Sequence, residues 1–147
     1  MMNEIDQQDS IALRVSKKLN ASVAEVWNAW TNPEEIAKWW LPEGFSESGA
    51  PEVDLRVGGE FKYHMQPPEG DAFYAHGIFK EIVPNSKIKS TWLWSTSDAE
   101  TELTIEFNEV GESTEIVILH EFFTDEEKKN KHTEGWLGMI DRIEKLF

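Results

Sequence analysis

The stretch STEIVILHEFFTDEEKKNKHTEGWLGMIDRIEKLF, residues 113–147, decides the fold, because a β-branched and aromatic strand runs directly into a long amphipathic helix. Thr124 and Glu127 predict a capping box that opens a helix over residues 125–147. Its apolar side chains fall on one stripe: Trp136, Met139, Ile140, Ile143, Leu146 and Phe147. That stripe has to be covered, so the pattern predicts a sheet packed against a C-terminal helix.

Two short helices are predicted near the other end of the chain. Ser22 and Glu25 form a second capping box, and Asn32 followed by Pro33 starts another helix, which Pro42 ends. The apolar faces of these two helices carry Val23, Val26, Trp27, Trp30, Ile36, Trp39 and Trp40.

Between the helices the hydrophobic period changes to two, which is typical of strands with one solvated face. Residues 60–65, 87–94 and 102–107 alternate in this way, and residues 10–19 and 114–123 are also strand-like. The expected order is one strand, two short helices, six strands and a long helix, which is an α+β fold. Short turns suggest registers in which His64 faces His76, Phe79 and Glu81 face Trp92 and Ser90, Ile105 faces Ile116, and Thr101 faces His120.

Composition limits the functional classes. The 147 residues, 39% of them hydrophobic, suit a single domain over residues 1–147. The chain has no cysteine, which excludes disulfides and thiolate chemistry. A net charge of −14 without a basic block disfavours nucleic acid, and the absence of a signal-peptide pattern or long apolar run disfavours membrane insertion. A cytoplasmic location is expected.

Several segments, in order, also resemble one known family. They are VWNAWTNPEEIAKWW (26–40), VGGEFKYHM (57–65), STWLW (90–94), LTIEFNEVGEST (103–114), and His132 with Gly135 and Trp136. Residues 10–147 resemble the activator of heat-shock-protein ATPase homologue C-terminal-like family. That family is a branch of the SRPBCC ligand-binding superfamily, which includes START domains and the birch pollen allergen.

The resemblance implies a helix-grip fold, in which a seven-stranded antiparallel sheet surrounds the C-terminal helix and leaves an apolar cavity. It further implies lipid binding and a link to stress response. The eukaryotic co-chaperones of this name act largely through a separate N-terminal domain, for which this chain has no room. Their activity is therefore not expected to carry over, although a chaperone or homodimer partner stays open.

Alternation and helix angle predict which side chains line such a cavity. The inner strand faces, the C-terminal helix and a lid over the cavity mouth provide mostly aromatic groups, with three polar groups among them. The candidate ligand-binding residues are Trp39 and Trp40 (the lid), Phe61, Tyr63, Phe79, Glu81, Trp92, Trp94, His120, His132, Trp136 and Met139. The alternative for each ring is that it fills the core. Gly135 is expected to let the helix approach the sheet or a ligand closely, and packing on the sheet is the favoured reason.

Three functions remain open. The first is binding of a small hydrophobic or aromatic molecule without a cofactor. The second is a cyclase- or hydrolase-like enzyme that uses Glu81, His120 or His132, and the third is a protein-interaction module related to the co-chaperones. His64 and His76, facing each other, suggest a metal pair, but alternation places them on the solvated face, so no metal site is predicted.

Overall fold

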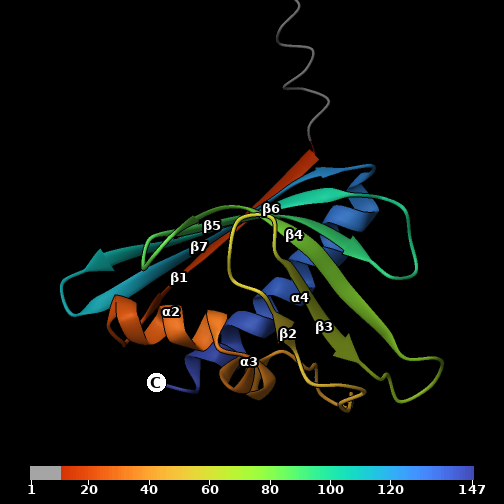
Figure 1. Cartoon of the computed structure of the whole chain (residues 1–147), viewed down its shortest axis with the longest axis horizontal. Helices are drawn as coiled ribbons and strands as arrows, with labels where there is room; N and C mark the ends of the chain where they lie inside the picture. Colours follow the sequence, from red (N-terminus) through yellow and green to blue (C-terminus); the bar gives the residue numbers. More distant parts are fainter. Residues whose placement is uncertain (1–10) are drawn as a thin grey trace, which may run out of the picture.

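Seven antiparallel strands form one curved sheet that closes around the C-terminal helix in the computed structural model, which describes residues 11–147 (Figure 1). The elements are β1 (Ile11–Leu19), α2 (Val23–Thr31), α3 (Pro33–Trp39), β2 (Glu52–Val53), β3 (Glu60–Met65), β4 (Phe73–Val83), β5 (Lys87–Trp94), β6 (Thr101–Val110), β7 (Ser113–Phe123) and α4 (Glu126–Glu144). The strand order is β1-β7-β6-β5-β4-β3-β2. The predicted α+β helix-grip fold is confirmed.

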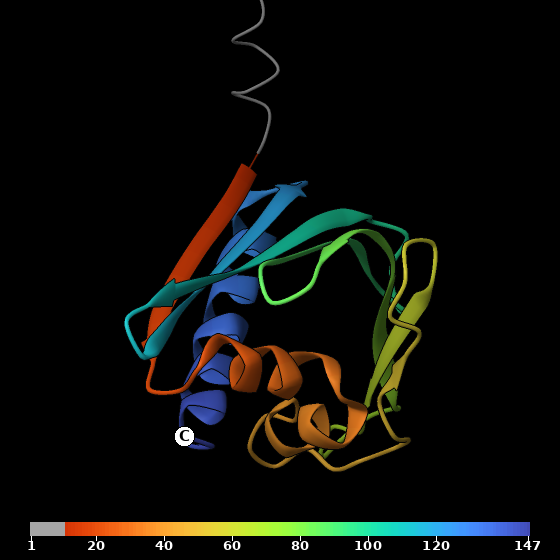
Figure 2. The ribbon, with the colours of Figure 1, turned by 60° about the vertical axis from the view of Figure 1, so that its left-hand side comes forward.

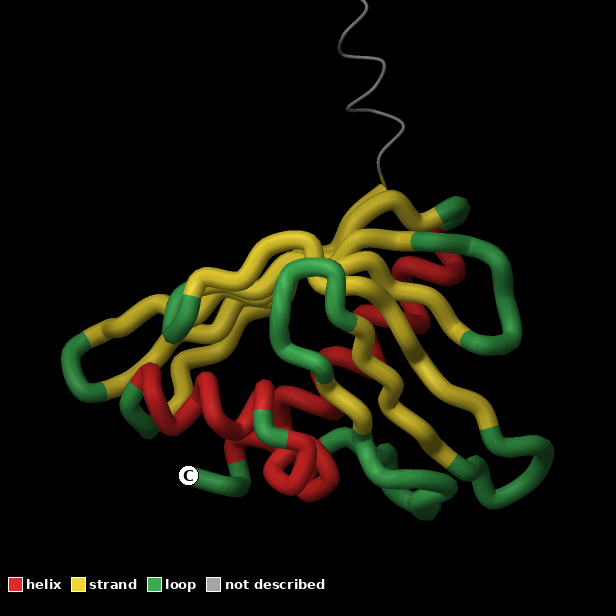
Figure 3. The backbone as a smooth tube through the Cα atoms, in the orientation of Figure 1, coloured by secondary structure: helices red, strands yellow, loops and turns green. Residues whose placement is uncertain are grey.

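The helices lie on the concave side of the sheet. Helix α4 packs mainly on β1 and β7, and α2 packs on β6 and β7 (Figure 2). Strands β3 and β4 curl away from α4 and form the opposite wall (Figure 2), and Figure 3 shows these strands bending away from the rest of the sheet. Side chains project into the space between α4 and this wall, and their packing determines whether a ligand fits there.

Helix starts follow local side-chain chemistry. Ser22 Oγ accepts a hydrogen bond from the amide of Glu25 at 3.2 Å, and the Glu25 carboxylate accepts one from the Ser22 amide at 3.1 Å, so the first predicted capping box is confirmed. Asn32 caps α3, with Pro33 in the first turn as predicted.

The predicted start of α4 is wrong by one residue. The N-cap is Asp125, whose side chain accepts the amide of Lys128 at 2.8 Å, so Thr124 and Glu127 form no capping box. An aspartate in this position is as good an N-cap as threonine and also carries a charge that favours the helix N-terminus. The helix ends at Glu144, three residues before the predicted end.

The predicted strand registers are wrong by about two residues. His64 lies opposite Tyr74 rather than His76, Phe79 opposite Ser90, and Leu103 opposite His120. Ile105 pairs with Ile118 instead of Ile116, since the β6–β7 turn consists of Gly111, with φ +63°, and Glu112, one residue later than the predicted pairing requires. A shift of two residues leaves each side chain on the same face of the sheet, so most of the residues predicted to point inward do so.

A β-bulge in β4 changes one inward assignment. The register shifts by one between Phe79 and Glu81, so that Ile82 faces the core opposite Ile88 and Glu81 turns outward. Glu81 instead lies 3.3 Å from Lys87 Nζ in an exposed ion pair. Its predicted role as an inward polar group is therefore wrong.

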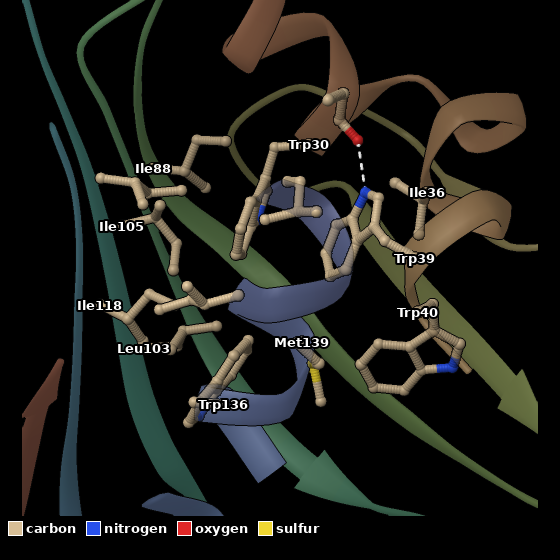
Figure 4. Packing of buried hydrophobic residues seen from close by; sticks show 14 of the residues in the cluster. Trp30, Ile36, Trp39, Trp40, Ile88, Leu103, Ile105, Ile118, Trp136 and Met139 are labelled. Carbon is tan, nitrogen blue, oxygen red and sulfur yellow. Dashed lines mark hydrogen bonds between the residues drawn. The ribbon is translucent and has the colours of Figure 1, made fainter. Parts of the chain in front are cut away.

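Tryptophans dominate the core beneath the sheet. The rings of Trp30 and Trp39 lie 4.7 Å apart and those of Trp30 and Trp136 lie 6.2 Å apart, while Trp39 Nε1 donates to the carbonyl of Ala29 at 2.8 Å (Figure 4). Trp39 and Trp40 are each only 1% exposed. They are core side chains that join α3 to the sheet, and the prediction that they form a lid is wrong.

Candidate ligand cleft

The centre of the core leaves almost no empty space. The space among the central side chains has a volume of about 20 Å³, which suits one water molecule and no ring-sized ligand. Most of the predicted inner-face aromatics surround it: Trp39, Trp40, Phe61, Tyr63, Phe79, Trp92 and Trp136. Their rings pack on one another, for example Phe61 on Phe79 at 5.4 Å and Trp40 on Tyr63 at 4.9 Å.

A much larger apolar space opens where α4 faces β5. This cleft has a volume of about 510 Å³, within the usual range of small-molecule sites. Strand β5, helix α4, the loop after α3 and the facing ends of β3 and β4 supply its walls. Its lining residues are Pro42, Phe45, Met65, Phe73, Trp92, Trp94, Lys131, His132, Gly135, Trp136 and Met139.

A second, smaller cleft of about 250 Å³ adjoins the first. The two share Trp92, Trp94, Lys131 and His132, and the smaller one is completed by Thr96, Ser97, Ala99, Thr101, Phe123, Thr124 and Lys128. A hydrogen bond of 2.8 Å from Trp94 Nε1 to His132 Nε2 joins two of the shared residues. These two side chains therefore form the boundary between the large and small clefts.

Gly135 shapes the large cleft from the helix side. A Cβ atom built on it would meet no heavy atom within 4 Å, so the glycine faces open space rather than a neighbouring element. The favoured expectation, that it lets the helix pack closely on the sheet, is wrong. Glycine inside a helix costs about 1 kcal/mol relative to alanine, so this position gives up stability and keeps the cleft wide.

His120 is sealed behind the cleft wall in a complete hydrogen-bond network. Trp136 Nε1 donates to His120 Nδ1 at 3.1 Å, which leaves the Nε2 proton to be donated to Thr101 Oγ1 at 2.7 Å. The Thr101 hydroxyl in turn donates to the carbonyl of Trp92 at 3.0 Å. Burial, assisted by nearby His132, lowers the pKa of His120 to about 2. The neutral ring thus holds the Trp136 side chain directly and the Trp92 backbone through Thr101, and at 0% exposure it cannot reach a ligand.

His132 is the histidine at the cleft surface. Because its Nε2 accepts from Trp94, its Nδ1 carries the proton and donates to the carbonyl of Lys128 at 2.8 Å. Burial lowers the pKa of His132, and the bond to the Lys128 carbonyl opposes that shift in part. Both ring nitrogens are therefore occupied, and the neutral imidazole presents an aromatic face to the cleft.

The candidate residues of the sequence thus separate into three groups. Trp92, Trp94, His132, Trp136 and Met139 line the large cleft. Trp39, Trp40, Phe61, Tyr63 and Phe79 surround the small void, while His120 lies behind the wall and Glu81 lies outside.

Sequence reasoning missed other parts of the lining. Pro42 and Phe45 lie in an irregular loop that has no periodicity, and Phe73 begins a strand whose first residues were not assigned. Met65 lies two residues beyond Tyr63 in the alternating segment 60–65, and this alternation is the signal that could have included it. Lys131 directly precedes His132 on the helix, but a single lysine on a polar helix turn gives no separate signal.

No group of three or more metal-ligating side chains occurs within residues 11–147. His64 pairs instead with Glu52 at 2.7 Å, and this hydrogen bond lowers the pKa of Glu52. In the same part of the chain, no helix has the length and apolar character needed to cross a membrane.

A curved antiparallel sheet gripping a C-terminal helix, with an apolar cleft at their seam, defines the helix-grip class of proteins. The family model described as "Activator of Hsp90 ATPase homolog 1-like protein" matches residues 20–147. The chain therefore belongs to this family, as the motifs in its sequence predict.

Solved structures agree with this assignment. CV1439 from Chromobacterium violaceum is 25% identical with a TM-score of 0.82, covering 92% of this chain and 95% of its own. NE0264 from Nitrosomonas europaea is 28% identical with a TM-score of 0.78, covering 92% and 93%. The AHSA1-like protein from Aeromonas hydrophila shares the fold at 21% identity and a TM-score of 0.73, covering 90% of each chain. No protein with curated functional information matches the chain significantly.

Proposed function

We propose that this protein binds a small apolar or aromatic molecule in the cleft between β5 and α4. The cleft of about 510 Å³ carries the proposal, because its volume and its aromatic lining are those of small-molecule sites. The ligand site lies at the seam between sheet and helix, and the central core contributes rigid support rather than space. This limits the ligand-contacting candidates to Trp92, Trp94, His132, Trp136 and Met139.

The aromatic walls set the strength of binding. Burying about 200 Å² of apolar ligand surface yields about 5 kcal/mol before the cost of association, at about 25 cal/mol per Å². Micromolar affinity therefore requires a cleft that is already formed. The bonds from Trp94 to His132 and from Trp136 to His120 hold two walls in place before any ligand arrives.

The groups named for an enzyme reaction do not converge on the cleft. Glu81 is outside, His120 is sealed, and both nitrogens of His132 are engaged. Nor do exposed apolar side chains single out a docking surface on the sheet, because they belong to the β2–β3 loop, β4, β6, β7, α4 and the end of the chain. Ligand binding without a reaction is accordingly the function that the geometry supports best.

Native mass spectrometry of freshly purified protein, followed by titration with the neutral fluorophore 1-aminoanthracene, tests the proposal. We expect a saturable 1:1 complex in the micromolar range, with backbone NMR shifts concentrated at Trp94 and Gly135. If no molecule copurifies and the probe shows no saturable binding, the proposal is contradicted. Binding that shifts resonances on the outer face of the sheet instead would also contradict it.

A further inference from the structure

Within residues 11–147, the lysine and carboxylate side chains that line the two clefts are lysines alone. Among the residues that the structure describes, Lys131 is the only one with a permanently charged side chain in the lining of the large cleft, and the small cleft has Lys131 and Lys128. No carboxylate from residues 11–147 lines either space, although the whole chain carries 28 acidic and 14 basic residues. From this arrangement we infer that the ligand is an amphipathic anion, with an apolar body in the cleft and a carboxylate or similar group beside Lys131. This inference rests on the proposed function.

Lys131 is placed to serve both clefts. It lies on α4 next to His132, whose bond to Trp94 forms the boundary between the two spaces. A carboxylate near this boundary remains within reach of Lys131 whether the apolar body occupies the large or the small cleft. Lysine suits such a position because its flexible stem packs on apolar surface while its amine stays in water.

The amine of Lys131 is free to change partners. Its nearest carboxylate is Glu127, at 3.7 Å on the preceding turn, and the two side chains are 74% and 79% exposed. Exposed pairs of this kind contribute little to stability, so a ligand carboxylate can replace Glu127. Lys128 is similarly paired with Asp125 at 3.9 Å. Both lysines thus have only weak partners along their own helix.

The electrostatic field of the whole protein disfavours binding of an anion. The net charge of −14 repels negative ligands at a distance, so only a local cation allows the cleft to favour one. Lys131 supplies that cation at the cleft rim, where water screens part of its effect. We therefore expect selectivity for the anion of a few-fold rather than orders of magnitude.

A matched pair of competitors tests the inference. 2-Naphthoate and 2-naphthamide have nearly the same shape, and only the first is charged at pH 7.5. The affinity of each compound is measured by its displacement of bound 1-aminoanthracene, first from the wild-type protein and then from Lys131→Gln. Lys145→Gln is the control, because it removes the same charge at the other end of α4, away from both clefts.

We expect wild type and Lys145→Gln to bind naphthoate about fivefold more tightly than naphthamide, the size of one partly exposed ion pair. In Lys131→Gln that preference disappears while naphthamide affinity stays unchanged. Equal affinities in wild type, or a preference that survives in Lys131→Gln, overturn the inference and leave the proposed function standing. If 1-aminoanthracene itself fails to bind, the proposed function fails, and the inference fails with it.

Discussion

Acidification below pH 6.5 should destabilise the protein through His120. The pKa of this buried imidazole is about 2 in the folded state, against about 6.5 in an unfolded chain. Below pH 6.5 the unfolded state therefore binds more protons than the folded state. The contribution of neutral His120 to the free energy of unfolding is fully present above pH 6.5 and is lost as the pH falls. The loss is about 1.4 kcal/mol per pH unit, or about 2 kcal/mol between pH 7.5 and 5.0. His132, whose pKa is also lowered by burial, acts in the same direction.

Urea unfolding of wild type and His120→Gln at pH 7.5 and 5.0 measures this effect. The glutamine amide retains an acceptor for Trp136 Nε1 and a donor for Thr101, but it does not titrate. Whatever its baseline stability, the variant should lose about 2 kcal/mol less than wild type over this interval. The interval stays above the range in which Glu52 and Glu102, whose pKa values are lowered, become protonated. Equal losses in both proteins would refute the reasoning.

Three stability changes follow from single contacts, each measured by urea unfolding at pH 7.5. Gly135→Ala should raise the free energy of unfolding by up to about 1 kcal/mol, because the added Cβ meets no neighbour, and an unchanged or lower value would contradict this. Thr114→Val should lower it by about 1–2 kcal/mol, since the buried hydroxyl donates to the Ala21 carbonyl at 2.9 Å; no loss would contradict this. Arg142→Met should lower it by about 1 kcal/mol, because Nε donates to the Trp39 carbonyl at 2.8 Å; a neutral result would show that α3 needs no such cap.

Local sequence signals predicted the elements and their inward faces well. Capping residues such as Ser22 and Pro33 depend only on near neighbours, and alternation along β5 or β6 reports the face directly. Strand registers depend on the geometry of the turns, which a few residues of sequence do not determine. A turn that lies one residue later than predicted, at Gly111, shifts every β6–β7 pair by two residues. The bulge after Phe79 gave no recognisable signal, and it alone turned Glu81 outward.

The open cleft lies at the predicted seam between sheet and helix, but three of the residues named as lining it, Phe61, Tyr63 and Phe79, lie deeper in the core. Parity shows that Phe61, Tyr63 and Phe79 point inward, but it cannot show whether their rings fill the space or surround a guest. Side-chain packing decides this, and the structure leaves only about 20 Å³ among them. The location of the open cleft is marked by Gly135, because a glycine on this face of α4 leaves space where a larger side chain would stand.

Binding of 1-aminoanthracene to Gly135→Leu tests the central claim most directly. Glu134→Leu is the control, because Glu134 is exposed on the adjacent position of α4 and lines neither cleft. The cleft account predicts that Gly135→Leu folds with at least wild-type stability and binds the probe at least tenfold more weakly, while Glu134→Leu binds as wild type does. Unchanged affinity in folded Gly135→Leu would contradict it.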